Sequence, residues 1–192
     1  VLDHTLGGDP SLMHLRDQII ARAGGNPFFA EELVRSAIEQ GILTGTPGDF
    51  RATVASRDAP LPATIEAVVG SRIDRLAETD KLLLQAASVV GKEFPLSVGA
   101  QVAPISVEQA RRSAQRLLSA EMLYERLDVQ RDNFAFRHPL VQEAAYGSLG
   151  TEQRRQFHQG AAAALASQFR EQADEHASLF GHHWEEGGQS LF

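Results

Sequence analysis

The chain has 192 residues, a formal net charge of −7 at pH 7 and no cysteine. That charge excludes a global electrostatic attraction to nucleic acid or to an anionic membrane, and the lack of cysteine excludes a disulfide framework and any thiolate metal site. Apolar residues make up 43% of the chain, enough to bury a core, and the abundance of alanine, leucine, glutamate and arginine predicts a mainly helical fold.

Two helices are expected near the N-terminus. In "SLMHLRDQIIARAGG", Ser11 is the expected cap. The apolar positions at helical spacing are Leu12, Leu15, Ile19, Ile20 and Ala23. In "GGNPFFAEELVRSAIEQG" the two glycines end the first helix, Asn26 caps the second, and Pro27 takes the first helical position, where its missing N–H is not needed. The residues expected to face inward are Phe28, Phe29, Leu33, Ala37 and Ile38.

Residues 44–61 hold turn residues without a sustained period, which predicts a loop with a short strand around Phe50 to Val54 and places the domain boundary here. Two more helices are expected in "PATIEAVVGSRIDRLA" and "ETDKLLLQAASVVG". The stripe of the first is Ile65, Val68, Val69, Ile73 and Leu76. The second is apolar almost all round over 82–90, as expected of a core helix.

The period of the pattern changes in the second half of the chain. Shorter helices are expected at 95–102 and 106–120, followed by the alternating segments "MLYERLDV" and "FAFR", which predict a β-hairpin. Three helices followed by a hairpin are the order of a winged helix-turn-helix domain. Helical patterns return after Pro139, and the last two have the character of one helical-repeat unit, which cannot bury its own face alone.

Five motifs in this order resemble a known family. They are "GNPFFAEELV", "LPATIEAVVGSRIDRL", "LLLQAASVVGKEF", "FAFRHPLVQEAAY" and "QRRQFH". Together they are similar to the region that follows the ATPase core in STAND-class signalling ATPases, above all those fused to bacterial adenylate/guanylate cyclase domains, with relatives among large LuxR-type regulators. The resemblance implies a helical lid, a winged helix and the start of tetratricopeptide-like (TPR-like) repeats, with ATP or ADP bound in the full-length parent.

The resemblance also implies three nucleotide-contacting residues. The lid of that family carries a G-x-P motif whose proline packs near the adenine, which here is Gly25, Asn26 and Pro27. Related regulators carry a histidine at the end of the winged helix that contacts the ADP β-phosphate, and His138 matches that position. An aspartate commonly follows that histidine, whereas this chain has Pro139.

Local roles also explain these residues. The "GGNP" turn is accounted for as a helix C-cap followed by an N-cap, and His138 as a capping residue at a strand-to-helix junction. Gly91-Lys92 is not part of a P-loop, because the motif needs glycine at 86 and serine or threonine at 93. No nucleophile–base pair stands out, so no catalytic residue is expected in this chain.

Two further clusters suggest other functions. His176, His182 and His183 lie near glutamates but lack the i, i+4 spacing of a helical zinc site, so no metal is expected. Arg111, Arg112 and Arg116 lie where a DNA-binding winged helix would place its recognition helix. The alternative function is therefore the DNA-binding part of a LuxR-type transcriptional regulator, against which stands the negative charge of the chain.

The sequence thus predicts a lid segment at 1–48, a linker at 49–61, a winged-helix domain at 62–149 and a first TPR-like repeat at 150–192. The expected function is to couple nucleotide state and partner binding to an output domain, with the ATPase core and the output domain as partners on the same polypeptide. A protein partner or inducer is expected on the repeats. No apolar run approaches the roughly 20 residues of a membrane helix, so a cytoplasmic location without membrane contact is expected. Because the chain begins at Val1 and stops just after a helical pattern, we expect it to be part of a longer protein.

Overall fold

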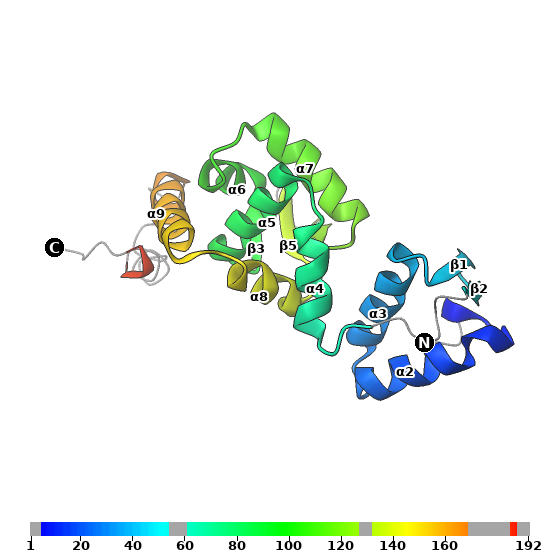
Figure 1. Ribbon diagram of the computed structural model, residues 1–192. Helices are drawn as coiled ribbons and strands as arrows, with labels where there is room; N and C mark the ends of the chain where they lie inside the picture. The colour runs from blue at the N-terminus through cyan, green and yellow to red at the C-terminus, as the bar shows by residue number, and fades with distance from the viewer. Residues whose placement is uncertain (1–4, 54–60, 127–131, 169–184, 188–192) are drawn as a thin grey trace. The chain divides into compact units, whose positions relative to one another are not determined.

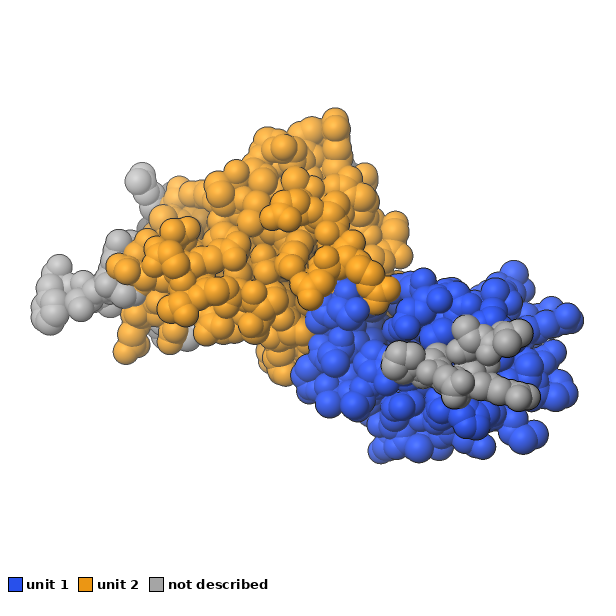
Figure 2. All heavy atoms as spheres, viewed as in Figure 1, with its two compact units in different colours: residues 1–72 blue, residues 73–192 orange. Residues whose placement is uncertain are grey.

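A computed structural model describes residues 5–53, 61–126, 132–168 and 185–187 (Figure 1). In these residues the protein is mainly helical with small antiparallel sheets, as the composition predicts. The chain divides into two compact units, Val1–Arg72 and Ile73–Phe192 (Figure 2). The division lies inside a helix, some distance along the chain from the linker expected at 49–61.

The first unit begins with the short 3-10 helix η1 (Pro10–Leu12), which leads directly into α2 (Met13–Ala23). Asp9, rather than the expected Ser11, caps this start, because its carboxylate accepts the Ser11 N–H at 2.9 Å. After α2 the chain turns and forms α3 (Pro27–Glu39). Both helices therefore form where the apolar periodicity predicts them.

A hairpin, rather than a loop, follows α3. Its strands β1 (Leu43–Thr46) and β2 (Asp49–Ala52) pair antiparallel. Of these two strands, only the one near Phe50 was expected. Gly45 has φ 123°, and a Cβ there would lie 2.3 Å from the Asp49 carbonyl oxygen, so the tight pairing requires glycine. The hairpin is fastened to the start of the unit, since the Ala52 N–H donates to the Ser11 hydroxyl at 3.0 Å.

The core of the first unit combines both helices with the hairpin. Its members include Leu15, Ile19, Phe29, Leu33, Ala37, Leu43, Phe50 and Val68. Two residues expected to face inward do not: Ile20 is 54% exposed and Ile38 is 41% exposed. Each lies one position beyond a buried residue, so the buried stripe of each helix is narrower than the run of apolar letters suggests.

The helix α4 (Ile65–Asp74) contains the division between the units. Its predicted stripe is largely confirmed, because Val68, Val69 and Ile73 are buried. Ile65 is partly buried, and Leu76 lies just after the last helical residue.

The second unit has the order α5 (Glu78–Val90), β3 (Glu93–Pro95), α6 (Leu96–Val102), α7 (Val107–Ser119), β4 (Leu123–Glu125) and β5 (Asn133–Phe136). The strands form one antiparallel sheet in the order β3-β5-β4. The hairpin of β4 and β5 was predicted and the three-residue strand β3 was not. Figure 1 shows α5 in the middle of this unit, and it packs against α6 and α7.

Aromatic residues of the sheet lie close to one another. The Phe94 ring lies 6.1 Å from that of Phe134 and 6.2 Å from that of Phe136, between centroids. On α6, a Cβ at Gly99 would lie 3.1 Å from the Phe94 ring, so glycine allows this helix to approach the sheet closely. Every residue of α5 from Leu83 to Val90 is buried, as expected of a core helix.

Two helices follow the sheet, α8 (Pro139–Gly147) and α9 (Thr151–Gln168). They meet where the Tyr146 hydroxyl oxygen lies 3.1 Å from Nε2 of the buried His158. Further along the chain, the Gly187 carbonyl accepts hydrogen bonds from Gln159 at 2.8 Å and Arg155 at 3.2 Å. Most of the second helix expected for the repeat lies outside the described residues. No helix in the described parts of the chain is long and apolar enough to cross a membrane.

Candidate functional site

The "GGNP" turn has the capping geometry that its residues predict. Gly24 ends α2 in the left-handed conformation with φ 55°. The Phe29 N–H donates to the Asn26 side-chain oxygen at 3.2 Å, and Pro27 is the first residue of α3. Asn26 and Pro27 are both exposed. The local role is confirmed, and contact of this turn with a nucleotide stays a prediction.

His138 caps α8. Its backbone is extended, and its Nδ1 accepts the Leu140 N–H at 3.2 Å. A ring nitrogen that accepts a hydrogen bond carries no proton, so the neutral imidazole has its proton on Nε2. The half-buried ring can therefore cap the helix with one nitrogen and donate from the other. Donation to an anion is the chemistry that phosphate sensing requires.

The three expected site residues lie in two places. Asn26 and Pro27 share one turn of the first unit, whereas His138 joins β5 to α8 in the second unit. Each is held at the start of a helix, where backbone N–H groups point outward and the helix dipole favours negative charge.

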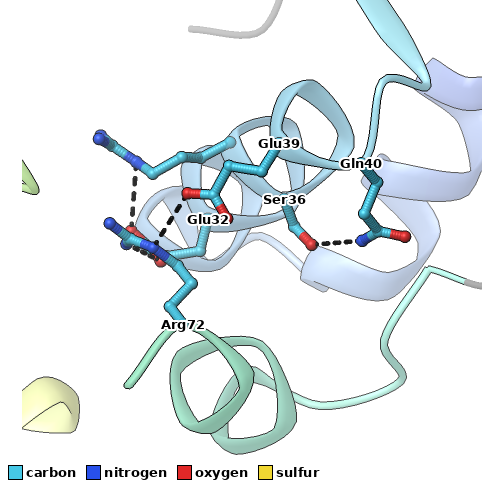
Figure 3. A network of polar contacts seen from close by, with 6 residues as sticks. Glu32, Ser36, Glu39, Gln40 and Arg72 are labelled. Atoms are coloured by element: carbon cyan, nitrogen blue, oxygen red, sulfur yellow. Dashed lines mark hydrogen bonds and ion pairs between the residues drawn. The ribbon is translucent and has the colours of Figure 1, made fainter. Parts of the chain in front are cut away.

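A buried ion-pair network in the first unit was not predicted (Figure 3). Arg72 of α4 pairs through Nη1 with Glu32 of α3, and both side chains are almost fully buried. The Arg72 Nε lies 3.6 Å from Glu39, and Arg35 lies 3.7 Å from the Glu32 carboxylate. Beside it, Gln40 donates to Ser36 at 2.7 Å.

The sequence did contain a signal for this network. Glu32 follows Phe29 by three positions, and Arg72 follows Val68 by four, so each charged residue lies on the buried face of its helix. Charged residues at such positions are rarely buried unless they are paired. The partner could not be predicted, because the two residues are 40 positions apart.

The three arginines of α7 are all paired with carboxylates. Arg111 makes two hydrogen bonds to Asp132, at 2.6 and 2.9 Å. Arg112 pairs with Glu108 one turn earlier, at 3.1 Å. Arg116 makes two hydrogen bonds to Asp80 of α5, at 2.8 and 2.6 Å. The helix face that would meet DNA therefore has much of its positive charge neutralised.

Asp80 is the most strongly held of these carboxylates, with its side chain 5% exposed. Burial by itself raises the pKa of Asp80, but hydrogen bonds from Arg116, Ser113 and Thr79, together with the positive charge of Arg116, outweigh that effect and hold the pKa below its usual value. The Asp80–Arg116 pair therefore holds α7 against α5 in its charged form.

Two other groups of residues were considered in the sequence, Lys92 and a histidine cluster. Lys92 is exposed in the turn after α5, as expected of a residue outside any P-loop. His176, His182 and His183 lie outside the described residues. Within the described ranges there is no group of three histidine, cysteine or carboxylate side chains that could hold a metal ion.

No family model matches this chain, and no curated protein or solved structure matches it either.

Proposed function

We propose that this chain is the regulatory region of a STAND-type signalling ATPase, made of the lid, the winged helix and the start of the TPR-like repeats. It relays the nucleotide state of an ATPase core, together with binding events on the repeats, to an attached output domain. The output domain in this proposal is an adenylate/guanylate cyclase. The nucleotide is ATP or ADP, held mainly by the core.

The observation that carries the proposal is the topology of the second unit. Its elements follow one another as helix, strand, helix, helix, strand and strand, which is the order of a winged helix. In the sheet order β3-β5-β4, the first strand, β3, pairs with β5 of the hairpin. His138 lies two residues after the end of the last strand and caps the next helix. This is the position of the phosphate-contacting histidine in the family that the motifs resemble.

The geometry of His138 is suited to that role. Capping of α8 by Nδ1 fixes the orientation of the ring and leaves the proton on Nε2, which is a directional donor. The start of α8 adds a favourable field for negative charge. A phosphate bound there by the core would connect the core to the winged helix, so that loss or exchange of nucleotide changes the contact between them.

The last helices support the repeat assignment. The hydrogen bonds from Arg155 and Gln159 to the Gly187 carbonyl show that the chain returns to α9 after leaving it, as a helical hairpin would. Stacked repeats present extended surfaces, which suits the binding of a protein partner or inducer.

Two substitutions at His138 separate sensing from capping. In the longer protein with its ATPase core, His138→Ala removes both the cap and the Nε2 donor, whereas His138→Asp keeps an acceptor for the Leu140 N–H and has no donor. We expect both to weaken ADP binding by roughly 10- to 100-fold, as loss of a hydrogen bond to a charged group does, and to raise basal output. Isothermal titration calorimetry measures the affinity.

Wild-type ADP affinity in the His138→Asp protein would leave His138 with a capping role alone and contradict the proposal. The 192-residue chain by itself is expected to bind ADP weakly or not at all, because the phosphate cradle is assigned to the core. Tight binding by this chain would contradict that division of roles.

The alternative function, a DNA-binding winged helix, is disfavoured by the α7 arginines. Each already has a carboxylate partner, so binding of a DNA phosphate would first have to displace Asp132, Glu108 or Asp80. The cost is greatest at Asp80, whose buried carboxylate would lose its main partner.

A further inference from the structure

The helix α4 contributes to both compact units. Val68 belongs to the hydrophobic core of the first unit. Ile73, five positions later, is fully buried and is the first residue of the second unit. The residues between them therefore determine whether α4 continues as one rigid helix across the division.

Gly70 and Ser71 lie in this stretch. A Cβ on Gly70 would meet nothing within 4 Å, so packing does not require glycine here. Glycine in a helix interior is less stable than alanine, because its backbone loses more freedom on folding. Kinks in helices occur characteristically at glycine and serine pairs. Gly70-Ser71 is thus a weak point of α4 that packing does not explain.

Arg72 comes directly after this weak point and is the residue that the buried network holds. Its guanidinium, 6% exposed, pairs with Glu32 and lies 3.6 Å from Glu39, both on α3 (Figure 3). Val68 holds α4 before the weak point, and the ion pair holds it after the weak point. A break at Gly70 therefore requires the guanidinium to leave Glu32.

Because the Arg72–Glu32 pair is buried, it restrains α4 only while both partners are in place. A buried ion pair contributes little net stability compared with apolar residues of the same size, but the loss of one partner leaves an uncompensated charge. Such a pair favours one geometry strongly while it is intact. An apolar side chain in place of Arg72 would hold α4 against α3 with less dependence on one geometry.

We propose that α4 is a hinged helix that breaks at Gly70-Ser71, and that the Arg72–Glu32 ion pair is the restraint that keeps it continuous. The hinge is a property of this chain alone and does not depend on the function proposed above. It gives the chain a defined point at which the helix at the division can change direction.

Amide hydrogen exchange in the 192-residue chain, followed residue by residue by NMR, tests the hinge. The N–H groups of residues 71–74 bond across Gly70, so breakage exposes them selectively. Glu32→Gln is expected to speed their exchange at least tenfold while the amides of α2 change less. Gly70→Ala, which leaves the ion pair intact, is expected to slow it about fivefold. In the double variant the alanine should offset part of the acceleration.

Two variants serve as matched controls. Asp74→Asn removes an exposed ion pair of the same helix, with Lys81, and should change the rates less than twofold. Gly147→Ala fills an equally open glycine in α8 and should leave α4 unchanged. Equal acceleration throughout the first unit in Glu32→Gln would mean that the pair only supports the core. That result, or unchanged rates at 71–74 in Gly70→Ala, would overturn the hinge.

Discussion

The side chains of two residues hold the starts of the helices α3 and α8. Asn26 accepts the Phe29 N–H, and His138 accepts the Leu140 N–H. Both residues precede a proline at the first helical position. Capping depends on atoms within three residues, so the local sequence is sufficient to predict it. Contact between a cap and a ligand depends on groups far away in the sequence, so the capping rules do not predict it.

The cap at Asn26 can be measured directly. Asn26→Ala removes the acceptor of the Phe29 N–H, so we expect the free energy of unfolding of the first unit to fall by about 1 kcal/mol. Urea denaturation, with amide exchange in α3 as a local probe, measures the loss. Asn26→Asp keeps a capping oxygen and should stay within about 0.5 kcal/mol of wild type. An equal loss in both variants would show that the turn needs the amide for another reason.

At the scale of elements, the sequence predicted long periodic helices better than short strands. The buried run of α5 and the hairpin of β4 and β5 were predicted because their periods are sustained. The strand β3 covers only Glu93–Pro95, too few residues to show alternation. Most of β1 and β2 could not be predicted because they include the turn residues "TGTPGD", which are all exposed. Only the residues on either side of this segment, Leu43 and Phe50, are buried.

Charged contacts between elements were beyond sequence analysis for a different reason. Ion pairs such as Asp80–Arg116 and Glu32–Arg72 join residues 36 and 40 positions apart, which the fold alone brings together. From the sequence, the arginines of α7 suggested a basic DNA-binding face. In the structure each of these arginines holds a carboxylate, and Arg116 ties α7 to α5.

The Asp80–Arg116 pair makes the stability of the second unit depend on pH. The pKa of Asp80 is lowered in the folded state, so the unfolded chain binds more protons in acid. The stabilisation is complete above the ordinary aspartate pKa of about 3.9 and is lost as the pH falls through the lower folded value. Urea midpoints between pH 5 and pH 3 should therefore fall more steeply in wild type than in Asp80→Asn.

At pH 7 the Asp80→Asn protein should be less stable than wild type by about 2 kcal/mol, because the charged hydrogen bonds to Arg116 are weakened. Glu108→Gln provides the control. It removes the exposed pair with Arg112 and should cost no more than about 0.5 kcal/mol. Parallel pH profiles for Asp80→Asn and wild type would show that the carboxylate is not the group responsible.

At the scale of the whole molecule, charge separates the two candidate functions. The chain carries −7 at pH 7, and the described arginines of α7 are engaged with acidic partners. A DNA-binding domain needs a surface whose cations can release counterions from phosphates, and its affinity then falls steeply with salt. Here the net field repels a polyanion, so a chain of this composition is better suited to contact protein than DNA.

A labelled DNA duplex should therefore show no mobility shift with the 192-residue chain at about 150 mM salt, at protein concentrations up to the roughly 10⁻⁴ M typical of weak nonspecific binding. Arg111→Ala and Arg112→Ala should not alter that result, because neither guanidinium is available to phosphate without breaking an ion pair. A shift that weakens steeply between about 50 and 200 mM salt, and that Arg111→Ala reduces, would instead establish α7 as a DNA-reading helix. That outcome would favour the transcriptional-regulator alternative, because a relay between an ATPase core and an output domain requires no contact with phosphates of DNA.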